Sequence, residues 1–175
     1  MKLPVVGGVV ALAIVVLDQV VKAGVLAYFS GPNVDPRPLA PFLDLTLRLN
    51  RGISFSLFAR DSASGEAALL AVTLAATILL AWWLIRTRSA LPAVGLGLII
   101  GGALGNAIDR LQHGAVIDYL DLHAFGRHFF VFNVADAAIN IGVLLLIVDL
   151  LVAPRLTEGG RSGTLQKSSN RRNQW

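Results

Sequence analysis

The chain has 175 residues, of which 55% are hydrophobic and 15% charged, and its mean hydropathy is +0.67. A water-soluble domain of this length could not bury so much apolar surface, so lipid must solvate part of the chain. The formal charge of +4 does not indicate a nucleic-acid partner, because many basic residues lie in the tail and in short connections, where they suit a membrane surface. The chain contains no cysteine, which excludes disulfides, thiolate metal sites and cysteine nucleophiles.

Four segments are long and apolar enough to cross a bilayer, which takes about 20 helical residues. The first begins after Lys2 and continues to about Phe29, and the others cover residues 67–85, 91–108 and 134–153. The first is too long for a cleaved signal peptide, so we expect it to be retained. The positive-inside rule weakly favours two cytoplasmic termini. Residues 1–153 would then form the membrane domain, and the polar residues 154–175 a disordered cytoplasmic tail.

The connection between the first two helices carries a strand pattern. Residues 43–50 alternate strictly between apolar and polar side chains, which predicts a strand with one apolar face. The alternation resumes at 53–57, so we expect a small antiparallel β-sheet between these helices, on the extracytoplasmic side and with its apolar face toward the membrane. A loop that rests on the lipid is the alternative.

Two ionisable residues, Asp18 and Lys22, lie within the first predicted helix, where each costs about 2.5 to 3.5 kcal/mol. Four residues apart, they share a helix face and can pair with each other or hold a neighbouring loop. We interpret them as a structural clasp.

The third predicted helix carries glycine at every fourth position, at Gly97, Gly101 and Gly105, which favours close helix packing. Asn106 follows on the side that faces the Asp109-Arg110 pair at the helix end. The sequence leaves open whether this pair anchors the helix at the interface or has a functional role.

Asp118 lies in the short connection between the third and fourth predicted helices, and Asp136 begins the fourth, so we expect both at the same membrane face. Two carboxylates in a weakly solvating site tend to share one proton, and this pairs a base with an acid, as aspartic proteolysis requires. Alternatively, they are separate groups at the interface. The three histidines lack the spacing of a helical zinc site, and no nucleophile elbow or Walker loop occurs.

Five short motifs occur in one order along residues 18–136. They are Asp18-Gln19-x-x-Lys22, Asn50-x-Gly52 with Phe55, Gly105-Asn106-x-x-Asp109-Arg110, Val116-x-Asp118-Tyr119, and Phe132-Asn133-x-Ala135-Asp136. In this combination the chain resembles the lipoprotein signal peptidase family, also called signal peptidase II.

The resemblance implies a bacterial inner-membrane aspartic peptidase that removes the signal peptide of diacylglyceryl-modified prolipoproteins, cutting before the lipidated cysteine. By analogy Asp118 and Asp136 are its catalytic pair, on the extracytoplasmic face. The other matched residues support the site or the substrate: Asn50, Gly52, Asn106, Asp109, Arg110 and Asn133, with Asp18 and Lys22 as structural residues. The resemblance implies no metal or organic cofactor. We expect a monomer that binds no nucleic acid.

Two other classes of protein remain open from the residues alone. In a proton-coupled transporter the ionisable residues of the helices would form a path, although they gather toward one membrane face and no internal repeat is apparent. In a scaffold protein the glycine face would serve assembly.

Overall fold

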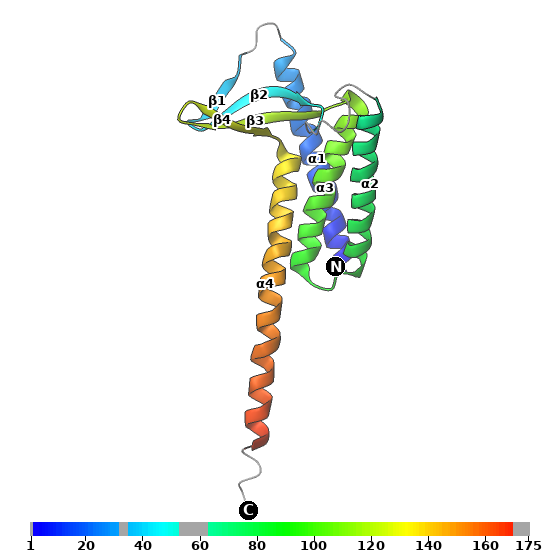
Figure 1. Cartoon of the computed structure of the whole chain (residues 1–175), viewed down its shortest axis with the longest axis vertical. Helices are drawn as coiled ribbons and strands as arrows, with labels where there is room; N and C mark the ends of the chain where they lie inside the picture. The colour runs from blue at the N-terminus through cyan, green and yellow to red at the C-terminus, as the bar shows by residue number, and fades with distance from the viewer. Residues whose placement is uncertain (1, 32–34, 53–62, 170–175) are drawn as a thin grey trace, which may run out of the picture.

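The computed structural model describes residues 2–31, 35–52 and 63–169, without the side chains of residues 63, 64, 66 and 153–169. The elements are α1 (Leu3–Phe29), β1 (Arg37–Ala40), β2 (Leu43–Asn50), α2 (Ala63–Arg86), α3 (Ala90–His113), β3 (Val116–Ala124), β4 (Arg127–Phe132) and α4 (Val134–Ser169). The sheet lies across one end of the helices, opposite the N-terminus (Figure 1).

Each of the four helices contains a span long and apolar enough to cross a membrane, which confirms the four predicted helices. In α3, 61% of the span is buried, against 17% or less in the other three. The large apolar side chains exposed on the other helices, such as Leu12, Ile78 and Leu144, suit contact with lipid. α3 is therefore the central helix, against which the others pack.

α1 and α3 approach each other closely along the predicted glycine face. A Cβ atom on Gly97 would lie 2.5 Å from the Gly7 carbonyl oxygen, and one on Gly101 would lie 2.6 Å from that of Ala11. Only residues without a side chain allow this approach. It brings the next turns of α1, with their polar residues, directly against α3.

The four strands form one antiparallel sheet in the order β1-β2-β3-β4. β2 confirms the strand predicted over residues 43–50, but its described partners are β1 and β3. The residues 53–57, which we expected to pair with it, lie outside the described part of the chain. Half of the sheet thus comes from the connection between α3 and α4, which the sequence analysis treated only as a short link.

β3 is fixed to α1 by its apolar side chains. Ile117 and Tyr119 are buried in a cluster with Val25 of α1. Because side chains alternate along a strand, Asp118 between them points to the opposite side. Packing of β3 on α1 therefore determines where the Asp118 carboxylate lies.

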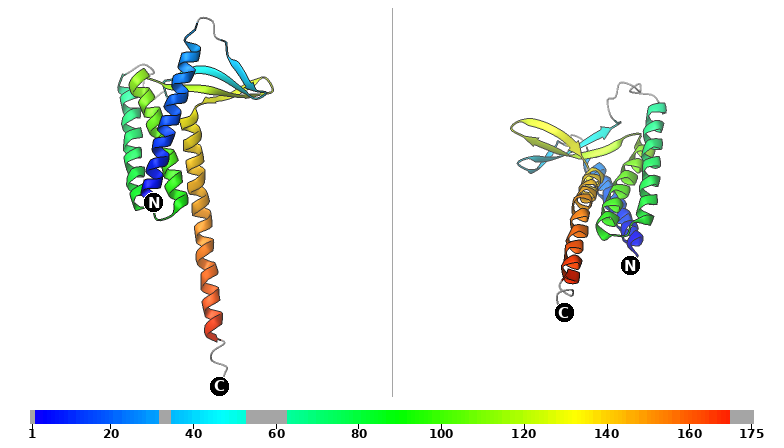
Figure 2. Two further views of the ribbon diagram at one scale, coloured as in Figure 1. Left: turned by 180° about the vertical axis from the view of Figure 1, so that it is seen from behind. Right: turned by 60° about the horizontal axis from the view of Figure 1, so that its bottom comes forward.

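α4 continues as a helix to Ser169, beyond the ends of the other helices (Figure 2). The backbone of α4 therefore runs on through residues 154–169, the first part of the predicted tail. The division into a membrane domain and a cytoplasmic tail stays a prediction.

Candidate active site

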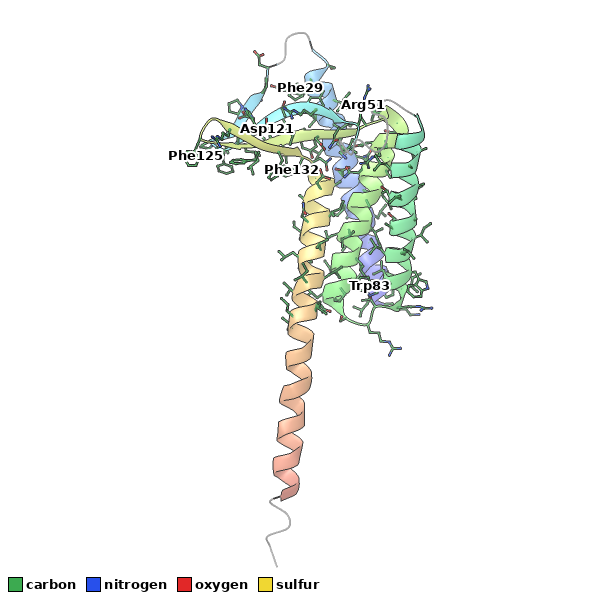
Figure 3. The ribbon with its side chains drawn as sticks, viewed as in Figure 1. Phe29, Arg51, Trp83, Asp121, Phe125 and Phe132 are labelled. Carbon is green, nitrogen blue, oxygen red and sulfur yellow. The ribbon has the colours of Figure 1, made fainter. Side chains whose placement is uncertain are left out.

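Asp118 on β3 and Asp136 in the first turn of α4 meet where the sheet joins the helices. Phe132 marks this junction at the end of β4 (Figure 3). Asp118 is 3% exposed, and Asp136 is partly buried. The fold thus brings together two carboxylates that are 18 residues apart in the sequence.

Asn133 connects the two carboxylates. Its side-chain amide donates to Asp118 Oδ1 at 2.7 Å, and its backbone N–H donates to Asp136 Oδ2 at 3.3 Å. In return, the Asp136 N–H donates to Asn133 Oδ1 at 2.9 Å, a reciprocal cap at the start of α4. The same bonds that begin the helix therefore orient both aspartates.

Two further amides bind the remaining carboxylate oxygens. Asn50 Nδ2 donates to Asp118 Oδ2 at 2.9 Å, and Asn106 Nδ2 donates to Asp136 Oδ1 at 2.8 Å. The N–H of Gly52, with φ at 101°, donates to Asn50 Oδ1 at 3.0 Å and so turns the Asn50 amide toward Asp118. All four carboxylate oxygens accept hydrogen bonds from uncharged groups, which orient the pair without neutralising it.

The surroundings of Asp118 favour its protonated form. Burial raises the pKa of the Asp118 carboxyl above its ordinary value, and the nearby charge of Asp136 raises it further. Hydrogen bonds from Asn50 and Asn133, together with the charge of Lys22, act in the opposite direction. Asp118 therefore holds a proton to higher pH than an exposed aspartate does.

Lys22 is 2% exposed and is connected to Asp136 through the side chain of Asn106. Its ammonium group lies 2.7 Å from Asp18 Oδ2 and 2.7 Å from Asp109 Oδ2, and it donates to Asn106 Oδ1 at 3.1 Å. Asp18 and Lys22 do lie side by side, as their spacing predicts. The contact with Asp109 on α3 was not foreseen, because sequence spacing cannot give contacts between helices.

Two residues of the matched motifs that we had not assigned to the site also contribute. Gln19 Nε2 donates to Asp109 Oδ1 at 3.0 Å, and a polar side chain next to Asp18 within an apolar helix was a signal for this contact. The Tyr119 hydroxyl accepts the N–H of Val134 at 3.3 Å. Burial raises the pKa of Tyr119 to about 12, so the phenol stays neutral.

Of the predicted site residues, Arg110 has the least direct connection to the two aspartates. Its guanidinium donates to the Asn106 carbonyl of its own helix at 3.4 Å, and no described hydrogen bond joins it to Asp118 or Asp136. His123 and His128 lie on the sheet, near Asp44 and Asp121. Within the described ranges, no three histidine or acidic side chains are grouped as a metal site would require.

The fold and the site together define a class of protein: a multi-pass membrane protein with two amide-bound aspartates where a surface sheet meets the helix ends. The family model described as signal peptidase (SPase) II matches residues 10–152. The chain therefore belongs to the signal peptidase II family, and it is a protease.

Curated relatives and solved structures agree with this family. The chain is 49% identical to the lipoprotein signal peptidase of Beijerinckia indica subsp. indica, over 83% of this chain and 87% of the relative. It is 50% identical to the lipoprotein signal peptidase of Methylorubrum extorquens, over 85% of this chain and 88% of that relative.

Two bacterial membrane enzymes solved by the in meso method superpose with TM-scores of 0.72 and 0.70, at 32% and 31% identity. Each alignment covers 83% of this chain, and 92% or 87% of the solved one. The chain is a multi-pass bacterial membrane protein, and the matches give no support to the transporter alternative.

Proposed function

We propose that this protein is an aspartic endopeptidase of the bacterial inner membrane that removes signal peptides from prolipoproteins. Its substrate would carry a diacylglyceryl group on a cysteine, and cleavage would fall just before that cysteine. The observation that carries this proposal is the pair Asp118 and Asp136, linked through Asn133 and oriented by amide donors. Membership of the signal peptidase II family supports the class of substrate.

In this mechanism Asp136 is the base and Asp118 the acid. Asp136 lies in the first turn of α4, where the helix dipole favours a negative charge. It would take a proton from a water molecule as the water attacks the scissile carbonyl. Protonated Asp118 would donate a hydrogen bond to the carbonyl oxygen, and the pair would then deliver a proton to the leaving amine.

The amides would keep the pair in position while its charge changes. Asn50 and Asn133 donate to Asp118, and Asn106 donates to Asp136, so each carboxylate keeps a partner when a proton moves. These contacts would reduce the rearrangement needed at the moment of reaction. We propose the same supporting role for Gly52 and Asp109. Gly52 orients the Asn50 amide through its N–H, and Asp109 accepts a hydrogen bond from the backbone of β3.

The membrane would fix the depth of the scissile bond. Asp136 lies at the start of the α4 span, so acyl chains buried in the bilayer would hold the adjoining peptide at the level of the carboxylates. We place this face outside the cell and both termini in the cytoplasm. Lys2, Arg86 and Arg88 lie together at the end of the bundle opposite the sheet, which supports this orientation.

We further propose that the protein acts as a monomer, without a metal, an organic cofactor or a nucleic acid. One chain supplies all the donors that orient Asp118 and Asp136. Cleavage in the presence of a chelator, by protein that elutes as a monomer, is the expected result.

The proposal is tested by incubating the purified protein with a prolipoprotein that carries the diacylglyceryl group and, separately, with the same precursor without it. Mass spectrometry should show loss of the signal peptide from the lipidated precursor only. Equal cleavage of both precursors would remove the proposed role of the lipid, and cleavage of neither would contradict the function.

A further inference from the structure

A buried polar cluster beneath the aspartates joins α1 to α3. Lys22 Nζ contacts one oxygen of Asp18 and one of Asp109, each at 2.7 Å, and it donates to Asn106 Oδ1 at 3.1 Å. An ammonium group has three N–H donors, so these three contacts use all of them. We call the group formed by Asp18, Lys22 and Asp109 the fork.

Each carboxylate of the fork also holds the backbone beside one of the two site aspartates. Asp18 Oδ1 accepts the N–H of Ala135, the residue before Asp136, at 3.0 Å. Asp109 Oδ2 accepts the N–H of Ile117, the residue before Asp118, also at 3.0 Å. Lys22 therefore lies at the centre of two matching connections, one to α4 and one to β3.

The third contact of Lys22 determines the orientation of an amide. Because an ammonium group can only donate, the atom of Asn106 that faces Lys22 has to be the oxygen. The Asn106 NH₂ group is then directed toward Asp136, to which it donates at 2.8 Å. Asn133 Nδ2 also donates to Asn106 Oδ1, at 3.2 Å, so without the ammonium group the orientation of the Asn106 amide would depend on this bond alone.

Stability alone does not account for the composition of the fork. Two carboxylates beside one ammonium group leave an excess negative charge in a buried place, and burying charge is costly even when partners are present. Gln19 Nε2 lies within hydrogen-bonding distance of Asp18 Oδ2 (3.3 Å), Asp109 Oδ1 (3.0 Å) and the Gly105 carbonyl (3.2 Å), but it brings no positive charge. A single ion pair would fasten α1 with less buried charge, whereas both carboxylates are needed to hold both backbone segments.

We propose that Lys22 is a positioning residue that sets the separation and the orientation of Asp118 and Asp136. It acts through Asp18 on the start of α4, through Asp109 on β3, and through Asn106 on the Asp136 carboxylate. This inference rests on the proposed peptidase function, and it adds a role in turnover to the structural role expected from the sequence.

The test is the Lys22→Met variant of the full chain, which removes the charge and keeps much of the side-chain length. For folded protein, kcat on the lipidated precursor should fall about 100-fold, because small displacements of reacting groups have effects of that order. KM should stay within about threefold, since Lys22 is buried and does not contact the substrate. The apparent pKa assigned to Asp118 in the kcat profile should rise, because the Lys22 charge that lowers it is removed.

The control is Leu96→Ala on α3, the helix that carries Asn106 and Asp109. Leu96 is 0% exposed and packs in the apolar core at a distance from the fork. This change should lower the melting temperature but leave kcat per folded molecule and the pH profile unchanged. A Lys22→Met variant that folds and behaves like Leu96→Ala, with kcat within about threefold of the unchanged protein, would overturn the inference.

If Lys22→Met does not fold, the triple variant Asp18→Asn, Lys22→Met and Asp109→Asn provides the test. It removes all three charges and keeps an oxygen for each backbone N–H. It should fold and still show reduced kcat and the altered pH profile. Failure of this variant to fold, or folded protein with unchanged kcat and profile, would each overturn a positioning role.

The unchanged protein separates this inference from the proposed function. If it does not cleave the lipidated precursor, the proposed function fails. If it does cleave, and the fork variants behave like Leu96→Ala, the function stands and only the role of Lys22 is wrong.

Discussion

α1 and α3 lie side by side along their length, but the two halves of their interface differ in kind. Away from the sheet the helices meet through Gly97 and Gly101, whose missing side chains let the backbones touch. Toward the sheet they meet through the fork and Asn106, by directed hydrogen bonds. The glycine half of the interface requires only small residues, whereas the polar half requires hydrogen-bond donors and acceptors at defined positions. The glycine half therefore sets the distance between the helices, and the polar half sets the geometry of the site.

The largest effect should come from the aspartates that the polar half positions. Asp118→Asn combined with Asp136→Asn should be about as inactive as either single variant, because residues that act as a unit give strongly non-additive losses. The measurement is the rate of cleavage of the lipidated precursor by all three variants. Losses that multiply would show that the two groups act independently.

Asn133→Ala should have the next largest effect, because Asn133 contacts both carboxylates and is 0% exposed. We expect about a 100-fold loss of kcat, from displacement of the pair, and about 1 kcal/mol of lost stability, from the cap of α4. Kinetics and thermal unfolding of the same preparation measure both. Lost stability at unchanged kcat would show that Asn133 acts only as the cap of α4.

Asn50→Ala separates an effect on turnover from an effect on stability, because Asn50 binds Asp118 from an exposed position on β2. Turnover should fall about tenfold, a loss of about 1.4 kcal/mol, whereas the melting temperature should hardly change. Thr46→Ala on the same strand serves as the control. Equal kcat for the two variants would show that Asn50 has no part in turnover.

Gly101→Ala tests the glycine half of the interface. The new Cβ would meet the Ala11 carbonyl at 2.6 Å, so the two backbones must separate, at a cost of about 1 to 3 kcal/mol. Gly8→Ala is a matched control, because a Cβ at Gly8 has nothing within 4 Å. Folded yield should fall for Gly101→Ala only, with less effect on kcat per folded molecule than the Asn133 change has.

The smallest expected effect is a pH dependence of stability. A group with a raised pKa in the folded state stabilises the fold below its unfolded value, here 3.8, and that contribution is lost as the pH rises through the raised pKa. Thermal unfolding should show this loss in the unchanged protein and a weaker dependence in Asp118→Asn. The same slope in both would mean that Asp118 is not the group responsible.

The sequence predicts those parts of the molecule that follow from local pattern. Hydropathy gives the four helices, alternation gives β2, and the spacing of the glycines gives the face that packs on α1. The position of Asp118 before the fourth helix and of Asp136 at its start predicts that both lie at one membrane face.

What the sequence could not give are contacts between distant segments. β2 pairs with β3 although α2 and α3 lie between these strands in the sequence. No local pattern identifies β3 as the partner. The contact of Lys22 with Asp109 depends on how closely α1 and α3 approach, which glycine permits but does not specify.

The central claim, that the two aspartates carry out the hydrolysis, is tested most directly by mass spectrometry of a lipidated prolipoprotein. The precursor is incubated in detergent with the unchanged protein and with folded Asp118→Asn and Asp136→Asn. The account predicts loss of the signal peptide with the unchanged protein, and rates at least about a thousandfold lower with either variant. Substantial cleavage by either folded variant would contradict it.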